Sequence, residues 1–199
     1  MSFISTLTAT MDGKEGVEKE GFEGKESGNF GNQLDVKEAK ALLQCCRDHG
    51  VNFFDNGEVY AHGRAEEIMG QAIRELGWKR SDVVVSTKIL RGGRGPNDKG
   101  LSRKHIVEGT KVSLKRLDMD YVDVIYAAAP TPPPPSRKPS AHEPRHRQGL
   151  GLLWGTGEWS ARQITKARAV AHRLDLLGPI VERPSTAKAT TMKVLVEAH

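Results

Sequence analysis

Short apolar segments alternate with amphipathic segments of helical period between residues 35 and 127. The apolar segments are residues 51–55, 83–89 and 121–127, and each has the length of a strand. They are too apolar to leave one face in water, so both faces of the resulting sheet have to be covered. Strands of this kind run parallel and are connected by helices that pack against them. The sequence therefore predicts an α/β fold with a parallel sheet.

The helical segments carry their own start signals. Asp35 and Glu38 have capping-box spacing at the start of the first helix, which ends near Gly50. Two more helices are expected over about residues 65–76 and 103–116, each with an apolar stripe on one side. A later unit is expected to contain a strand at 152–155, a helix at 160–174 and a strand at 179–181.

Two segments interrupt or precede this pattern. Residues 1–30 are rich in Gly, Lys, Glu, Ser and Thr without apolar periodicity, so we expect a disordered tail. Residues 128–150 contain many prolines and no apolar stripe, so no helix can run through them. The predicted barrel fragment is thus interrupted by a Pro-rich segment.

Composition excludes several classes of function. The net charge of +5 is not gathered on a folded module with interleaved aromatic residues, so no nucleic-acid partner is expected. Cys45 and Cys46 are adjacent and poorly placed to pair, and no secretory or membrane-spanning segment is evident. We expect a reduced, cytoplasmic protein without direct membrane insertion. No metal site is predicted, because prolines keep His142 and His146 off a common helical face.

A carboxylate, a phenol and an amine follow two successive apolar strands. Asp55 and Tyr60 come at and after the end of the strand at 51–55, and Lys88 lies near the end of the strand at 83–89. Barrel enzymes place catalytic groups at the carboxyl ends of their strands. Asp55, Tyr60 and Lys88 are therefore the candidate catalytic residues.

The stretch VNFFDNGEVYAHGRAEEIMG, followed by VVVSTKI, resembles the aldo-keto reductase family. Residues 31–127 as a whole resemble its voltage-gated potassium channel beta-subunit branch, and the similarity resumes over 154–184. The resemblance implies a (β/α)8 TIM barrel that binds NADPH and reduces small aldehydes and ketones. It also implies a homo-tetramer that associates with a potassium channel alpha subunit, and so a peripheral place at membranes.

The resemblance also assigns roles. Tyr60 would be the general acid, Lys88 would make the phenol more acidic, and Asp55 would hold Lys88 charged beside the nicotinamide ribose. Gln33 matches a cofactor contact, and Glu158 is a further candidate for cofactor binding.

The expected fold is a partial barrel over residues 31–184, containing about strands two to six with their helices and not closed. Residues 185–199 are expected to form a divergent tail. Three positions differ from the family pattern: Ala128 stands where a His or Asn polarises the carbonyl, Gly157 where a Ser holds the nicotinamide amide, and Arg183 where a Gln is usual. We expect these differences, with the strands missing after the sixth, to impair catalysis.

Two other interpretations stay open: a non-catalytic, channel-associated regulatory fragment, and a nonfunctional product of a frameshifted or mis-spliced gene. The second arises because one nucleotide string that encodes Arg147–Leu153 reads, one base later, Asp-Lys-Gly-Trp-Ala-Phe-Tyr-Trp, which resembles the family's entry into its fifth strand. Residues 128–153 would then be translated out of frame. Resequencing the transcript tests this, and an uninterrupted single-frame match to relatives would refute it.

Overall fold

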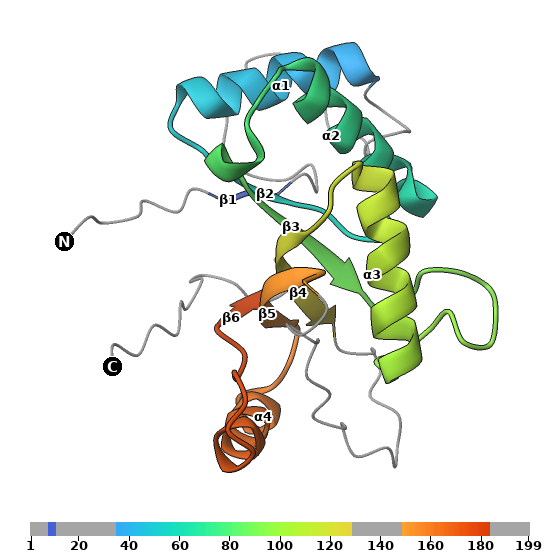
Figure 1. Cartoon of the computed structure of the whole chain (residues 1–199), viewed down its shortest axis with the longest axis vertical. Helices are drawn as coiled ribbons and strands as arrows, with labels where there is room; N and C mark the ends of the chain where they lie inside the picture. The colour runs from blue at the N-terminus through green and yellow to red at the C-terminus, as the bar shows by residue number, and fades with distance from the viewer. Residues whose placement is uncertain (1–7, 11–34, 129–148, 184–199) are drawn as a thin grey trace.

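The computed structural model describes residues 8–10, 35–128 and 149–183, and its sheet is entirely parallel (Figure 1). Six strands follow one another in chain order across the sheet. They are β1 (Thr8–Thr10), β2 (Phe53–Asp55), β3 (Val84–Ile89), β4 (Val122–Ala128), β5 (Gly151–Gly157) and β6 (Val181–Arg183). Among the described residues no strand pairs β1 with β6, so the sheet stays open.

The α-helices are α1 (Val36–Asp48), α2 (Arg64–Glu75), α3 (Arg103–Leu117) and α4 (Ala161–Arg173), with two short 3-10 turns, η1 (Tyr60–Gly63) and η2 (Arg80–Asp82). Three of the four α-helices begin after a capping side chain, which is Asp35, Ser102 or Ser160, whereas α2 follows Gly63 and has none. Asp35 and Glu38 form the predicted capping box, and Ser160 forms another with Gln163. Within the described ranges, no helix combines the length and apolar composition that crossing a bilayer requires.

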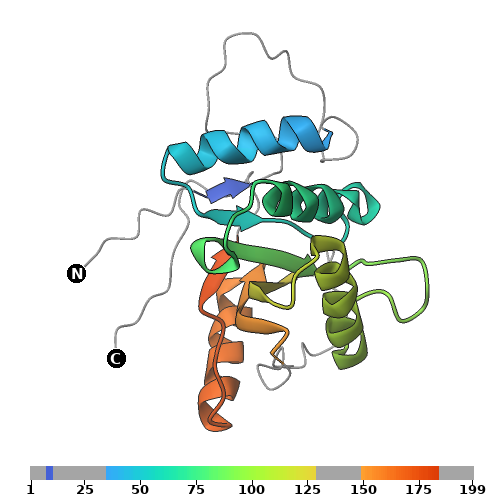
Figure 2. The ribbon, with the colours of Figure 1, turned by 45° about the horizontal axis from the view of Figure 1, so that its top comes forward.

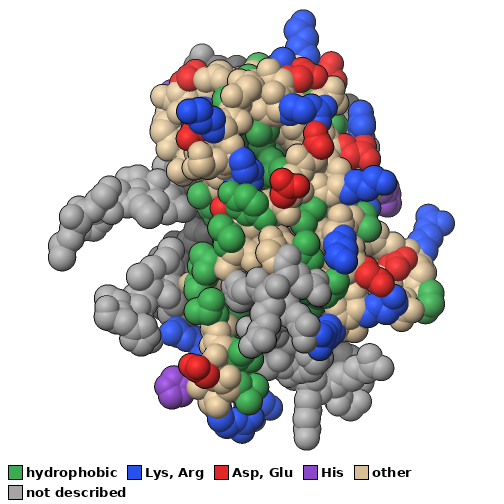
Figure 3. Space-filling model, in the orientation of Figure 1, with side chains coloured by type: hydrophobic (Ala, Val, Ile, Leu, Met, Phe, Trp, Pro, Cys, Tyr) green, Lys and Arg blue, Asp and Glu red, His purple; other side chains and the backbone are tan. Residues whose placement is uncertain are grey.

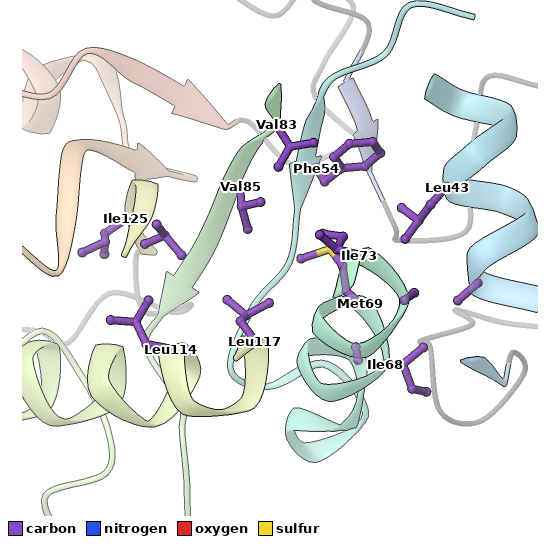
Figure 4. Packing of buried hydrophobic residues seen from close by; sticks show 14 of the residues in the cluster. Leu43, Phe54, Ile68, Met69, Ile73, Val83, Val85, Leu114, Leu117 and Ile125 are labelled. Carbon is purple, nitrogen blue, oxygen red and sulfur yellow. The ribbon is translucent and has the colours of Figure 1, made fainter. Parts of the chain in front are cut away.

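The main core lies between one face of the sheet and helices α1, α2 and α3 (Figures 1 and 2). Leu43 of α1, Met69 of α2 and Leu117 of α3 are fully buried there against Phe54 and Val85 of the strands (Figure 4). A smaller cluster joins α4 to β4 and β5. In Figure 3, charged side chains lie at the top, along the right side and at the lower end, while hydrophobic ones run down the middle of the molecule. The opposite face of the sheet, here called the site face, thus lies away from α1–α3.

The predicted partial, open α/β barrel is confirmed. The structure differs from the prediction at both edges of the sheet. Residues 8–10, expected within a disordered tail, form β1 and pair in parallel with β2. The last strand is Val181–Arg183 rather than 179–181, because Gly155, Thr156 and Gly157 pair with these three residues. The fifth strand is longer than predicted and includes Gly151 and Gly157.

Several expectations fall on residues that the structure does not describe. These are the remainder of the 1–30 tail, the Pro-rich segment over 129–148 with His142 and His146, Gln33, and the tail 185–199. They stay predictions.

Gly70 allows α2 and α3 to approach each other closely. A Cβ atom at this position would lie 2.2 Å from the carbonyl oxygen of Leu117. Replacing a helical glycine by alanine usually stabilises a helix by up to about 1 kcal/mol. At Gly70 the backbone of α3 would have to move to make room for the methyl group. We therefore expect the clash to outweigh the helix-stabilising effect of alanine.

We predict that Gly70→Ala lowers the free energy of unfolding by about 1–3 kcal/mol, measured by urea denaturation. Gly178→Ala is the matched control, because its new methyl group would meet its nearest neighbours at 3.6 Å. Equal stability of wild type and G70A would contradict the close helix contact.

Candidate active site at the strand ends

The register of the sheet brings polar side chains from four strands, β2, β3, β4 and β6, to the site face. Paired residues of parallel strands point to the same side, and successive residues alternate. The pairs that carry the site are Asp55 with Ser86, Lys88 with Tyr126, Tyr126 with Gly155, Ala128 with Gly157, and Gly157 with Arg183. The last residues of β2, β4, β5 and β6 are among them, and Lys88 is the last but one of β3. This is the end of the sheet where parallel barrels build their sites.

Asp55 and Lys88 form an ion pair at the centre of this group. The Asp55 side chain is only 2% exposed, and Lys88 Nζ donates to its Oδ2 atom. Lys88 Nζ also donates to the Asn56 carbonyl oxygen at 2.6 Å, while Ser86 Oγ donates to Asp55 Oδ1 at 2.6 Å. A carboxylate this deeply buried needs such partners to stay charged. The predicted pairing of Asp55 with Lys88 is therefore present.

Tyr60 lies beside the same ammonium group. Lys88 Nζ is 4.7 Å from the centre of the Tyr60 ring, within cation–π range. The ammonium group therefore lies over the ring of Tyr60. The three residues that the sequence names as catalytic thus meet in one place.

The turn that carries Tyr60 is held in an unusual conformation. Ala61 and His62, which follow it, have left-handed φ values of 48° and 56°. Such values cost about 1–2 kcal/mol for a residue with a Cβ atom, so packing has to maintain them. Arg116 of α3 provides that packing: its guanidinium lies against Gly63, where a Cβ atom would meet Cζ at 2.5 Å, and it donates to the Glu58 carbonyl oxygen at 3.4 Å.

Tyr126 is a second phenol on the site face. Burial raises its pKa, and the negative charge of Asp55 raises it further, against the opposing effect of Arg183. Tyr126 therefore holds its proton more tightly than an ordinary tyrosine.

Glu58 is a buried carboxyl group beneath the site that the sequence does not single out. It is 3% exposed and lies 3.2 Å from His105 Nε2, and its Oε1 atom accepts from the Leu90 amide at 2.5 Å. Burial raises the pKa of Glu58, and the contacts with Leu90 and His105 partly offset this. Gly92 and Gly109 leave the room for this carboxyl, since a Cβ atom at either would lie 3.0 Å or less from Glu58 Oε2.

Glu158, predicted to bind the cofactor, lies in the loop after β5 and is exposed. Its amide donates to the Arg183 carbonyl oxygen at 2.9 Å, so this loop is tied to β6. Glu182 fixes the same loop by accepting from Thr156 Oγ1 and from the Trp159 amide. Burial raises the pKa of Glu182, against the effect of these hydrogen bonds.

Ser86 and Arg183 contact Asp55 but are not among the predicted site residues. Ser86 could have been found, because it precedes Lys88 by two residues and so shares its face of the strand. Arg183 is visible in the sequence only as a departure from the family pattern. Its contact with Asp55 depends on the register of β6, which was predicted two residues too early. Within the described ranges, no three His, Cys, Asp or Glu side chains gather as metal ligands do.

The sequence matches the model of a known protein family and is similar to named proteins. The model of the aldo/keto reductase family matches residues 22–181. A protein named "probable voltage-gated potassium channel subunit beta" from Arabidopsis thaliana is 71% identical over 156 residues, which cover 78% of this chain and 48% of that protein. A protein of the same name from Oryza sativa subsp. japonica is 70% identical over 156 residues, with the same coverage. The chain thus spans about half the length of these relatives.

Glu58 predicts a particular dependence of stability on pH. Because burial raises the pKa of its carboxyl above the ordinary 4.5, the folded chain binds this proton more tightly than the unfolded chain. The stability that this proton contributes is complete below pH 4.5 and is lost as the pH rises through the folded pKa.

We therefore predict that the free energy of unfolding of wild type, minus that of Glu58→Gln, decreases from about pH 4 to about pH 8 in urea denaturation. Glu108→Gln, the same change on the exposed side of α3, should give a nearly constant difference. A difference between wild type and E58Q that stays constant or increases with pH would contradict a raised pKa of Glu58.

Proposed function

Because this chain belongs to the aldo/keto reductase family, we propose that its strand-end site reduces the carbonyl group of a small aldehyde or ketone with NADPH. The observation that carries the proposal is the meeting of Asp55, Lys88 and Tyr60. Carbonyl reduction needs a hydride for carbon and a proton for oxygen, and this group of residues suits the second task.

Tyr60 donates its hydroxyl proton to the carbonyl oxygen as the C=O double bond becomes a C–O single bond. Lys88 stabilises the phenolate that this leaves, and Asp55 keeps Lys88 charged and in place. Solvent then returns a proton to Tyr60. Since Ala128 has no donor, polarisation of the carbonyl falls to Tyr60 and Lys88.

Two of the positions beside these residues on the site face carry small residues. Ala128 and Gly157 are neighbours on β4 and β5 and place nothing larger than a methyl group there. Lys88, Tyr126 and Arg183 are their neighbours in the register of the sheet. A bound NADPH would supply the hydride for the carbonyl carbon. Asp55, Glu158 and Gln33 are the residues that we propose to hold it.

We also propose a regulatory role at a voltage-gated potassium channel, as a homo-tetramer that binds the alpha subunit in the cytoplasm. The identity of about 70% to two proteins named as probable channel beta subunits supports it. Co-precipitation with a channel alpha subunit tests this role independently of NADPH. Channel binding without NADPH binding would favour the non-catalytic interpretation over the reductase.

The catalytic proposal predicts a separation between binding and chemistry. Tyr60→Phe should bind NADPH as wild type does, measured by nicotinamide fluorescence, and reduce para-nitrobenzaldehyde about 10²–10⁴-fold more slowly. Tyr121→Phe is the matched control, because Tyr121 lies before β4 under Arg80, outside the site.

Wild-type turnover by Y60F would exclude Tyr60 as the acid. Failure of the wild-type chain to bind NADPH would exclude the reductase activity altogether.

A further inference from the structure

A buried carboxylate is attached to the strand of Lys88 from the helix side of the sheet. Glu66, in the first turn of α2, is fully buried. Its Oε1 atom accepts from Thr87 Oγ1 at 2.6 Å, and its Oε2 atom accepts from Arg116 at 3.1 Å. Thr87 precedes Lys88 in β3, and neighbours in a strand point to opposite faces. Glu66 therefore holds β3 from the face opposite the site.

The Arg116 guanidinium group contacts both ends of the segment that carries Tyr60. It donates to the carbonyl oxygen of Glu58, two residues before Tyr60, at 3.4 Å. It also lies against Gly63, three residues after Tyr60, where a Cβ atom would meet its Cζ and Nε atoms at 2.5 Å. The same group donates to Glu66, so one side chain joins both ends of this segment to a carboxylate that is bonded to β3.

The backbone between these two contacts is strained. Ala61 and His62 both have left-handed φ values, which residues with a Cβ atom avoid. Such a turn keeps its shape only while the surrounding structure holds it. The ring of Tyr60 follows this backbone, and its centre lies 4.7 Å from Lys88 Nζ. A shift of the turn would therefore change the place of the ring relative to the ammonium group.

We propose that Glu66 and Arg116 are positioning residues, which fix the ring of Tyr60 for proton transfer. Both act from the helix side of the sheet, Glu66 through β3 and Arg116 through the turn. A guanidinium suits this task, because its planar group presents several donors at once, whereas a lysine has a single nitrogen. The kinetic consequence of this inference rests on the proposed role of Tyr60, while the structural consequence does not.

NMR tests the position of Tyr60 without any need for activity. The chain has three tyrosines, so isotope-labelled Cζ atoms give three signals, which Tyr60→Phe and Tyr121→Phe assign. Arg116→Lys keeps the positive charge beside Glu66 but cannot make all the contacts of the guanidinium. It should move the signal of Tyr60 and leave that of Tyr121 in place.

Arg80→Lys is the matched control. The Arg80 side chain is 22% exposed, against 20% for Arg116, and it also pairs with a carboxylate, that of Asp123. Its guanidinium lies 4.0 Å from the ring centre of Tyr121. R80K should therefore move the signal of Tyr121 and leave that of Tyr60 in place. An unmoved Tyr60 signal in R116K, or an equal movement of it in R80K, would overturn the proposal.

Kinetics test the consequence for catalysis. R116K should reduce para-nitrobenzaldehyde with a kcat about 10- to 100-fold below that of wild type, because a displaced phenol slows the chemical step. Its Kd for NADPH should stay that of wild type, and R80K should keep the wild-type kcat. A wild-type kcat in R116K, or the same loss in R80K, would contradict the positioning role.

Glu66→Gln is the second variant. It removes the charge that holds the guanidinium, so it should move the Tyr60 signal in the same way. Should R116K fail to fold by circular dichroism, E66Q decides by the same signals and the same kcat.

The positioning role and the reductase activity fail in different ways. If wild type does not reduce the aldehyde while R116K still moves the Tyr60 signal, the reductase activity is refuted and the fixation of Tyr60 by Arg116 stands. If wild type reduces the aldehyde and R116K matches it in both signal and kcat, the reductase activity stands and the role of Arg116 is refuted.

Discussion

The buried carboxylate of Asp55 is the constraint on which the site depends. It accepts from Ser86 and Lys88 and pairs with Arg183, so it connects β2 with β3 and with β6. A buried pair is costly to break, because removing one partner leaves an unpaired charge at about 3–5 kcal/mol. Because the strands place Asp55 on the site face, Lys88 and Arg183 have to lie close to it to compensate its charge. The arrangement that holds the sheet ends together is thus also the one on which the proposed proton transfer depends.

A second polar cluster supports the first from the helix side of the sheet. Glu66 is fully buried and accepts from Thr87 Oγ1 at 2.6 Å and from Arg116 at 3.1 Å. Arg116 also packs against Gly63 in the turn that carries Tyr60. Helix α3 therefore fixes the position of the proposed proton donor, although none of its residues lies in the site. Residues on the helix side of the sheet thus position the proposed proton donor, while residues on the site face carry the proposed chemistry.

Much of this arrangement follows from the sequence, because strand period and register act together. The alternation of apolar strand segments with amphipathic helical segments predicts the parallel sheet. The positions of Asp55, Lys88 and Tyr60 at strand ends predict that these three residues meet. The Arg183 contact could not be predicted, since it needs the register of a three-residue strand and two small neighbours. The buried Glu58–His105 pair could not be predicted either, because its partners are 47 residues apart in the chain. Short strands and long-range polar pairs carry too little local signal.

The central claim is that Asp55 and Lys88 stabilise each other as a buried pair. A double-mutant cycle with Asp55→Asn, Lys88→Met and the double variant measures this directly through the free energy of unfolding in urea. The account predicts a coupling energy of about 1–3 kcal/mol, with the double variant more stable than the two single changes would sum to. Additive single changes, with a coupling below about 0.3 kcal/mol, would contradict it.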